Sequence, residues 1–351
     1  MGSEWVKKLT GECGFELAGV TSAIPTADAG TFQDWARRGL AGEMAYLTDY
    51  RAGLRLDPRQ LLPSARSIVC VGKLYNGPEP YSTRLFSGFS RQDLGWISRY
   101  AWGDDYHDLM RAGLKQLAQR MAEAAGPFEH KICVDTAPLL ERSYARLAGL
   151  GWIGKNTCLI NQKQGSWFFL GELLTSLDLA PDTPPPDRCG TCTRCIDACP
   201  TAAIRPSPDS VGWELDARLC ISYFTIELRE DVPEENRGAM GNHVFGCDIC
   251  QDVCPWNQRA TVSRETGFAP REFAPPLAKL ASLTEEEFAE VFRGSPVRRA
   301  KYRGFLRNVA IAMGNSGQPE FRAPLARLAE SPDELVASHA RWALAELGKL
   351  E

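Results

Sequence analysis

Apolar residues along the N-terminal half of the chain recur at two spacings, which predict helices and strands. A helix is expected from Trp5 to Cys13, and the run from Phe15 to Thr21 is rich in apolar and β-branched residues, as is typical of a strand. The near-continuous apolar run that begins at Ser67 is of the kind buried on both faces of a sheet. We therefore expect a layered domain of helices and a sheet.

The clearest helical pattern lies between Asp105 and Ala125. Gly126 and Pro127 end this pattern, as expected at the C-terminus of a helix. Its apolar positions are Met110, Leu114, Leu117 and Met121. This spacing predicts an amphipathic helix that packs on the sheet.

A second candidate strand, from Lys131 to Thr136, ends on an acidic residue. Its C-terminal end carries Asp135, and Pro138 and a further helical pattern follow. Ligands usually bind at strand ends of α/β sheets, so Asp135 is a candidate functional residue. Alternatively, Asp135 caps the next helix, with Pro138 at the first helical position.

The next segments predict a hairpin and a linker. Two apolar runs, residues 157–160 and 166–174, flank the polar turn 161–165, as in a hairpin. Strands and helices thus alternate along the chain, and the hairpin adds an antiparallel pair of strands. The proline-rich stretch 180–186 is typical of a linker between domains.

Beyond Pro255 the sequence becomes helical and basic. Residues 307–314 are echoed thirty-four residues later by residues 341–348, which suggests stacked helical repeats. A run of cations without an intervening acidic residue comes just before and at the start of the first copy: Arg293, Arg298, Arg299, Lys301, Arg303 and Arg307. Such a run is either a solvated face or a phosphate-binding surface.

Composition places the chain among ordinary globular proteins. Its 351 residues, 44% of them hydrophobic, suggest two or three domains, and a formal charge of −4 argues against a uniformly basic nucleic-acid binder while allowing a local basic patch. The first residues lack an apolar signal region, no eighteen apolar residues run together, and Val6 breaks a myristoylation pattern. We expect a cytoplasmic protein without membrane contact.

The chain contains twelve cysteines, and eight of them lie between residues 189 and 254. The first run, residues 189–200, has the C-x2-C-x2-C-x3-C-P spacing of bacterial ferredoxins. The second run, residues 247–255, lacks the first of these cysteines, because Val244 stands three positions before Cys247. Cys220 is the remaining cysteine nearby. Four plus four thiolates would hold two [4Fe-4S] clusters.

In two-cluster ferredoxins the last cysteine of each run binds the other cluster. This rule predicts two ligand sets, one of Cys189, Cys192, Cys195 and Cys254, the other of Cys199, Cys220, Cys247 and Cys250. Structural zinc sites are the alternative, but zinc ribbons do not need this third and fourth cysteine followed by proline. Disulfides are disfavoured in a cytosolic protein.

The order of further motifs resembles that of the epoxyqueuosine reductases over nearly the whole chain. The motifs are Ile97-Ser-Arg-Tyr-Ala-Trp-Gly-Asp-Asp-Tyr-His107, Val134-Asp135-Thr-Ala-Pro, Gly149-Leu-Gly-Trp-Ile-Gly-Lys-Asn156, the two cysteine runs and Gly241-Asn-His-Val-Phe-Gly-Cys247. Members of that family are cobalamin-dependent iron-sulfur enzymes that remove the oxygen of an epoxide from the wobble nucleoside of tRNA. The resemblance implies this reaction for the chain.

The same resemblance implies three domains. They are an α/β (α+β) cobalamin-binding domain of nitroreductase-like type over residues 1–180, a ferredoxin-like domain with two clusters over 181–261, and a HEAT-like helical repeat that binds tRNA over 262–351. The Asp-x-His-x-x-Gly cobalamin signature is not met, because Met110 occupies the glycine position. His107 is therefore not expected to bind cobalt.

The resemblance also implies roles for single residues. Asp135 matches the catalytic aspartate, and burial against an apolar corrin face would raise its pKa and keep it protonated as a proton donor. The implied cobalamin contacts are Arg55, Ser98, Tyr100, Asp135, Lys155, Cys158, Leu159, Ser222, Tyr223 and Asp248. The glycines near Lys155 either let the backbone approach the corrin or only permit a tight turn. Phosphates of tRNA would contact Arg298, Arg299, Lys301, Arg303 and Arg307.

Two other functions remain open from the sequence. A reductive dehalogenase would share cobalamin and two clusters, although it usually carries a twin-arginine signal and has no reason to end in basic repeats. A ferredoxin-like electron carrier fused to a binding domain would need neither cobalamin nor Asp135. For the reductase we expect a monomer that receives electrons from a low-potential donor that the sequence does not identify.

Overall fold

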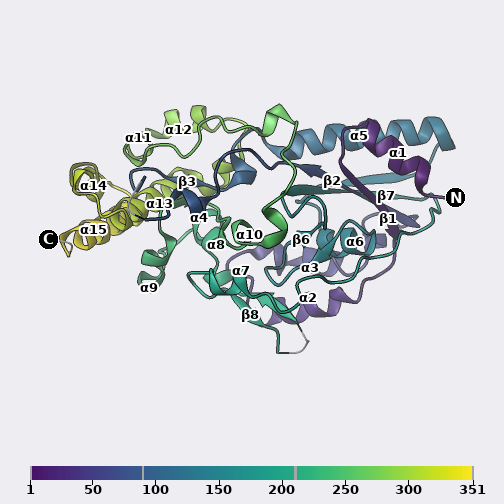
Figure 1. Cartoon of the computed structure of the whole chain (residues 1–351), viewed down its shortest axis with the longest axis horizontal. Helices are drawn as coiled ribbons and strands as arrows, with labels where there is room; N and C mark the ends of the chain where they lie inside the picture. Colours follow the sequence, from purple (N-terminus) through teal and green to yellow (C-terminus); the bar gives the residue numbers. More distant parts are fainter. Residues whose placement is uncertain (1, 89–90, 209–211, 350–351) are drawn as a thin grey trace.

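An antiparallel sheet of four strands forms the centre of the N-terminal part of the chain (Figure 1). The computed structural model, which describes residues 2–88, 91–208 and 212–349, orders these strands β1-β2-β7-β4. Their bounds are Leu17–Ser22 for β1, Ser67–Leu74 for β2, His130–Cys133 for β4 and Phe168–Thr175 for β7. Each neighbouring pair is antiparallel, so this part is the α+β rather than the α/β form of the prediction.

Helices cover both faces of this sheet, as Figure 1 shows at its right-hand side. Helices α1 (Glu4–Glu12) and α5 (Tyr106–Ala125) lie on one face, and α6 (Glu141–Leu147) lies on the other. The predicted apolar positions of α5 are buried against Val69 and Val71 of β2, while Ile68 and Cys70 of the same strand pack against α6. The strand is therefore buried on both faces, which confirms the interpretation of its apolar run.

The predicted hairpin over residues 157–174 is only partly correct. An isolated bridge between Asn161 and Gly165 closes the polar turn. However, β6 (Leu159–Ile160) pairs with β5 (Trp152–Ile153), whereas β7 pairs with β2 and β4. Gly151 allows the β5–β6 approach, because a Cβ there would lie 2.3 Å from the carbonyl oxygen of Ile160. The two apolar runs thus belong to different sheets.

The cysteine-rich part consists of short helices and strands. Their bounds are Arg194–Asp197 for α7, Ile204–Pro206 for β8, Trp213–Leu215 for β9, Ile221–Ile226 for α8, Glu234–Arg237 for α9, His243–Phe245 for β10 and Ile249–Asp252 for α10. Strand β10 pairs in parallel with β3 (Trp96–Ile97), and the backbone N–H of Asp182 in the proline-rich stretch donates to Val20 of β1. Both contacts join this part to the N-terminal part.

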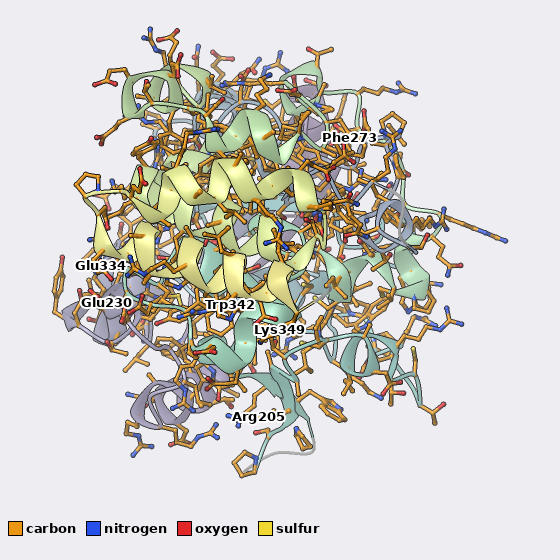
Figure 2. The ribbon with its side chains drawn as sticks, turned by 90° about the vertical axis from the view of Figure 1, so that its left-hand side faces the viewer. Arg205, Glu230, Phe273, Glu334, Trp342 and Lys349 are labelled. Atoms are coloured by element: carbon orange, nitrogen blue, oxygen red, sulfur yellow. The ribbon has the colours of Figure 1, made fainter. Side chains whose placement is uncertain are left out.

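Within the described residues, five α-helices form the C-terminal part, at the left in Figure 1. They are α11 (Leu277–Ala281), α12 (Glu285–Val291), α13 (Lys301–Asn315), α14 (Arg322–Ala329) and α15 (Glu334–Gly348). The two copies of the sequence repeat lie on α13 and α15, which cross so closely that a Cβ at Gly314 would lie 2.8 Å from the Cα of Ala343. Figure 2 shows this end of the molecule with Trp342 of α15 labelled.

The C-terminal helices do not have a core of their own. Val309 and Phe305 of α13 are buried in one cluster with Trp96, Ile97 and Phe245. The predicted boundary at residues 261 and 262 therefore stays a prediction. The remaining short helices are α2 (Asp28–Arg37), α3 (Tyr50–Leu54) and α4 (Ser82–Leu85). None of the helices within the described residues is long and apolar enough to span a membrane.

Candidate active site and cluster sites

Asp135 lies in the loop that follows β4, at the edge of the sheet. Its backbone has φ +51°, a conformation that side chains other than glycine seldom adopt. The side chain is 50% exposed. Its backbone N–H donates to Oε1 of Glu141 at 2.5 Å, and Glu141 opens α6. The capping alternative is wrong, since α6 begins at Glu141 without a side-chain cap and Pro138 lies outside the helix.

His107 connects Asp135 to the first turn of α5. Asp105 caps this helix, accepting the backbone N–H of His107 at 3.0 Å and contacting its ring Nδ1 at 2.6 Å. The other ring nitrogen, Nε2, lies 3.2 Å from Oδ2 of Asp135. Tyr106 stacks on the imidazole at 4.2 Å between ring centroids. The ring is therefore fixed between two carboxylates, neither nitrogen being free.

This arrangement sets the charge of the pair. Burial, the largest influence, would raise the pKa of Asp135, but the hydrogen bond and positive charge of His107 outweigh it and hold the pKa below its usual value. Burial alone would lower the pKa of His107, but hydrogen bonds to Asp105 and Asp135 outweigh burial and raise it to about 9. The protein's own groups thus lower the pKa of Asp135, and at neutral pH the proton resides on His107. The rise in this pKa beneath a corrin face stays a prediction.

Three tyrosines and one arginine border this pair. The charge of Asp135 contributes, after burial, to raising the pKa of Tyr46, Tyr100 and Tyr106, which places their hydroxyls near the carboxyl. Arg299 pairs with Glu227 at 2.6 Å and lies 5.3 Å from the ring centroid of Tyr46. An open cleft of about 430 Å³ lies between α2 and the segment of α3, lined by Phe32, Gln33, Ala36, Arg37, Thr48, Ala52 and Gly53.

The eight predicted cluster cysteines gather in two sets of four. The pKa of Cys195 is raised to about 11, first by burial and then by the nearby thiols of Cys254, Cys189 and Cys192. The pKa of Cys247 is also raised, first by burial and then by its neighbours, which include Cys220 and Cys199.

Cys250 completes the second set. Its pKa is raised first by a hydrogen bond with Cys158 and by burial, and then by Cys158, Cys247 and Cys220. Cys254 thus lies near Cys195, and Cys199 near Cys247, while the two ligand sets stay a prediction. No three His, Cys, Asp or Glu residues within the described ranges are placed to hold a single metal ion. The four thiolates of a cubane bind four different irons, so they need not converge on one point.

Several residues predicted to contact cobalamin also have partners within the protein, and their cobalamin contacts stay a prediction. The ammonium of Lys155 donates to the carbonyls of Gly190 and Cys192, at 2.8 and 2.9 Å, and so stabilises the loop of the first cysteine set. Leu159 is 4% exposed and packs in the core beneath the sheet. The hydroxyl of Tyr223 accepts the backbone N–H of Glu43 at 2.9 Å.

Asp248 and Ser98 form a buried pair behind the site. The carboxylate of Asp248 accepts hydrogen bonds from the Ser98 hydroxyl and from the backbone N–H of Arg99. The indole of Trp96 donates to it as well, at 3.2 Å. Since both Asp248 and Ser98 are at most 3% exposed, they fix β3 against the second cysteine set rather than offer an open surface.

Three predicted contacts remain near the cleft and the site. Arg55 donates to the carbonyl of Tyr46 at 2.9 Å and lies over the Phe32 ring, which lines the cleft. Tyr100 packs against Phe245. Ser222 is half-buried at the start of α8.

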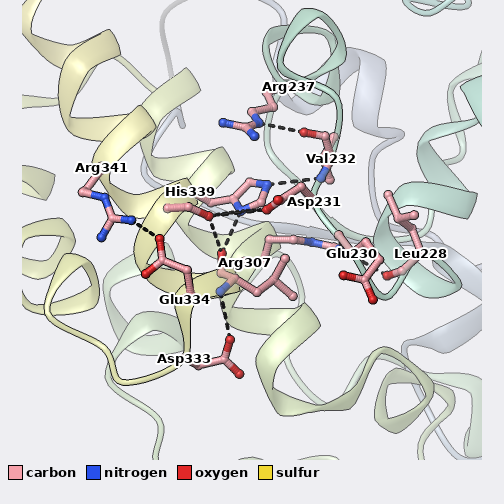
Figure 3. A network of polar contacts seen from close by, with 12 residues as sticks. Leu228, Glu230, Asp231, Val232, Arg237, Arg307, Asp333, Glu334, His339 and Arg341 are labelled. Atoms are coloured by element: carbon pink, nitrogen blue, oxygen red, sulfur yellow. Dashed lines mark hydrogen bonds and ion pairs between the residues drawn. The ribbon is translucent and has the colours of Figure 1, made fainter.

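Arg307 is not a tRNA contact, although it belongs to the predicted basic patch. Its side chain is fully buried and donates to the backbone carbonyls of Phe224 in α8 and of Leu228 and Glu230 just after α8. Figure 3 shows Arg307 beside Leu228 and Glu230. The same figure shows His339 of α15, whose ring nitrogen accepts the N–H of Val232 at 3.2 Å.

The other members of the patch lie at the surface. Arg298 and Lys301 are exposed, whereas Arg303 pairs with Asp333 at 3.0 Å and Arg299 with Glu227. Arg299 thus points from the basic segment toward the Asp135 site. Sequence reasoning missed Tyr46, the proton-holding role of His107 and the acid Glu141, because residues far apart in sequence create these contacts.

A double-cluster segment beside a carboxyl–imidazole pair defines the class of protein: an iron-sulfur oxidoreductase. A family model described as "4Fe-4S double cluster binding domain" matches residues 188–257, and one described as "Epoxyqueuosine reductase QueG, DUF1730" matches residues 55–136. The chain is 41% identical to the epoxyqueuosine reductase of Xanthomonas campestris over 98% of this chain and 95% of the relative. It is 39% identical to that of Escherichia coli, over 95% and 86%. The chain belongs to the epoxyqueuosine reductase family.

Solved structures agree with this assignment. A crystal structure of epoxyqueuosine reductase with an epoxyqueuosine-modified tRNA-Tyr stem loop superposes with a TM-score of 0.86 at 29% identity, covering 99% of this chain and 90% of that one. The Bacillus subtilis enzyme, described with its catalytic aspartate loop swung out of the active site, superposes with a TM-score of 0.85 at 27% identity, covering 98% and 90%.

Proposed function

We propose that this chain reduces epoxyqueuosine at the wobble position of tRNA to queuosine, releasing the epoxide oxygen as water. The observation that carries the proposal is the juxtaposition of two four-thiol sets with the Asp135–His107 pair in one chain. Converting an epoxide to an alkene and water consumes two electrons and two protons. Clusters bound by the thiol sets would pass on the two electrons, the Asp135–His107 pair would supply one proton, and the second proton would come from solvent.

Two [4Fe-4S] clusters are the cofactors that the cysteine sets suit. Each set offers one thiolate for each iron of a cube, and bound clusters supply single electrons at low potential. Lys155 stabilises the loop of the first set through its two carbonyl contacts. An external low-potential donor would deliver electrons to this surface, and a monomer suffices because one chain provides both sets.

Cobalamin is the second cofactor that we propose, as a metal-centred reductant for the carbon–oxygen bond. The site fits it in two respects. Both nitrogens of His107 are engaged, as expected where no histidine replaces the cofactor's displaced base. The half-exposed carboxyl of Asp135 lies near Tyr46 and Tyr106, so it could face a bound cofactor. Arg55, Tyr100, Ser222 and the backbone near Cys158 would hold it, with Ser98 and Asp248 behind them.

Asp135 and His107 act together in the protonation of the departing oxygen. His107 is the reservoir, because its pKa of about 9 keeps it protonated at neutral pH. Asp135 is the half-exposed group that can reach a bound substrate and pass this proton on. As in the Bacillus subtilis relative, we infer that the Asp135 loop has a second position, swung away from the site.

Incubation of the anaerobically reconstituted protein with tRNA containing epoxyqueuosine and an added low-potential chemical reductant tests the proposal, with cobalamin present or omitted. We expect queuosine to form only when cobalamin is present, and metal analysis to find iron. Equal conversion with and without cobalamin would show that cobalamin is not a cofactor of the reaction. No conversion in a protein that holds both clusters and cobalamin would overturn the proposed activity.

A further inference from the structure

Glu172 is a buried acid in the middle of the central strand β7. Its side chain is 0% exposed, and neither carboxyl oxygen has a hydrogen-bond partner that meets ordinary geometry among the described residues. It stands opposite Cys70 of β2 and Cys133 of β4, and paired residues of antiparallel strands point to the same face. That face is the one covered by α6. Buried carboxyl groups almost always have hydrogen-bond partners, so Glu172 is unusual.

The first residue of α6, Glu141, lies above Glu172. Burial, followed by the charge and hydrogen bonding of Glu141, raises the pKa of Glu172 well above its usual value, so the two carboxyls are neighbours. Burial and then the charge of Asp135 raise the pKa of Glu141 as well. A neutral Glu172 has a carboxyl hydroxyl that can donate a hydrogen bond to an oxygen of Glu141.

Glu141 also holds the loop that carries Asp135. Its Oε1 accepts the Asp135 backbone N–H at 2.5 Å, at the residue where φ is +51°. A backbone in this region persists only where the surroundings hold it. Among the contacts of the loop, this one connects the strained residue to the buried face of the sheet.

We propose that Glu141 and Glu172 form a two-carboxyl latch that holds the Asp135 loop in its position at the active site. The inference rests on the proposed function and deepens it. Both acids are positioning residues, since they act through the Asp135 backbone and do not touch substrate. Breaking the hydrogen bond between Glu141 and the Asp135 N–H releases the loop, whereas removing the Glu172 donor weakens the acceptor's hold.

Hydrogen exchange of the peptide spanning residues 134–141, followed by mass spectrometry in the reconstituted holoenzyme, tests the latch. Glu141→Ala is expected to speed exchange there about tenfold, because it removes the acceptor of the Asp135 N–H. Glu172→Leu should speed it several-fold, because it removes a donor to the same carboxylate. Glu172→Gln keeps a neutral donor and should remain close to wild type. Glu129→Ala, an exposed acid before β4, is the matched control.

Turnover of the same variants supplies the second readout. We expect kcat of Glu141→Ala to fall about tenfold while KM for tRNA stays near the wild-type value, with Glu172→Gln again close to wild type. If Glu141→Ala loses iron, Glu141→Asp is measured in its place. This variant keeps a carboxyl group but shortens its reach to the Asp135 N–H. Wild-type exchange and kcat in Glu141→Asp or Glu141→Ala overturn the latch. If the wild type is inactive while the variants still show the expected changes in hydrogen exchange, the latch stands and the proposed function is contradicted.

Discussion

At the scale of single residues, the site depends on which group holds the proton. A carboxyl against an apolar surface would keep its own proton, but Asp135 is half-exposed and lies 3.2 Å from a histidine that Asp105 holds on the other side. His107 stands 28 residues before Asp135 in sequence. The strand end predicts the aspartate, whereas only the folded chain brings the imidazole to it.

The first prediction concerns the pH dependence of this pair. The pKa of His107 rises from 6.5 to about 9 on folding, so its stabilisation is fully present below pH 6.5 and disappears as the pH rises through 9. Because Asp135 is half-exposed, we expect His107→Gln to cost roughly 1 kcal/mol at pH 6. Thermal unfolding should show a Tm difference from wild type that shrinks toward pH 10. A Tm difference independent of pH would contradict the pair.

The second prediction concerns catalysis by Asp135. Asp135→Asn preserves the size of the side chain but cannot transfer the proton, so kcat should fall by about a hundredfold or more. Asp108→Asn, an exposed acid in the first turn of α5, is the control and should retain activity. Absorbance confirms that clusters and cobalamin are bound in each variant. Near-normal turnover of Asp135→Asn would show that Asp135 does not transfer the proton.

At the scale of secondary-structure elements, periodicity predicts where helices and strands lie but not which strands pair. The apolar spacing of α5 and the apolar run of β2 are found as expected. The polar turn after β6 specifies a chain reversal, which the Asn161–Gly165 bridge confirms, yet it does not specify the partner of either flanking strand. Residue types alone likewise do not distinguish an exposed arginine from Arg307, whose buried carbonyl partners lie 77 to 83 positions away.

The third prediction therefore separates Arg307 from its neighbours. Arg307→Met would leave the carbonyls of Phe224, Leu228 and Glu230 without their donor, and it should destabilise the protein by about 3 kcal/mol. Lys301→Met, an exposed member of the same segment, should leave the Tm nearly unchanged. Equal Tm values for the two variants would show that Arg307 does not join α13 to the cluster segment.

At the scale of the whole molecule, one chain brings together a cluster segment, an acid–imidazole site and a basic surface. Arg299 connects the last two, since it comes from the basic segment and lies beside Tyr46 near Asp135. The two cysteine runs could be predicted from spacing because ferredoxin-like ligand order is local in sequence, whereas Cys220 lies outside both runs and is assigned only by the count of thiolates. The latch acids Glu141 and Glu172 could not, since an acid at a helix start and one within a strand carry no pattern of their own.

The fourth prediction concerns tRNA binding by the exposed cations. Arg298→Ala with Lys301→Ala should weaken tRNA binding and reduce the slope of log affinity against log salt by about one for each phosphate that is no longer neutralised. Filter binding over a series of salt concentrations measures both quantities. An unchanged slope would exclude these two residues from the tRNA surface.

The most direct measurement of the central claim follows the removal of the epoxide oxygen from tRNA, by mass spectrometry of its nucleosides, in wild type and in Cys220→Ser. Cys220 completes the second cysteine set, and Cys13→Ser, outside both sets, is the matched control. We predict conversion to queuosine by wild type and Cys13→Ser, and none by Cys220→Ser, which should also lose up to about half of its iron. Full conversion by Cys220→Ser, or zinc in place of iron in the wild type, would contradict the account.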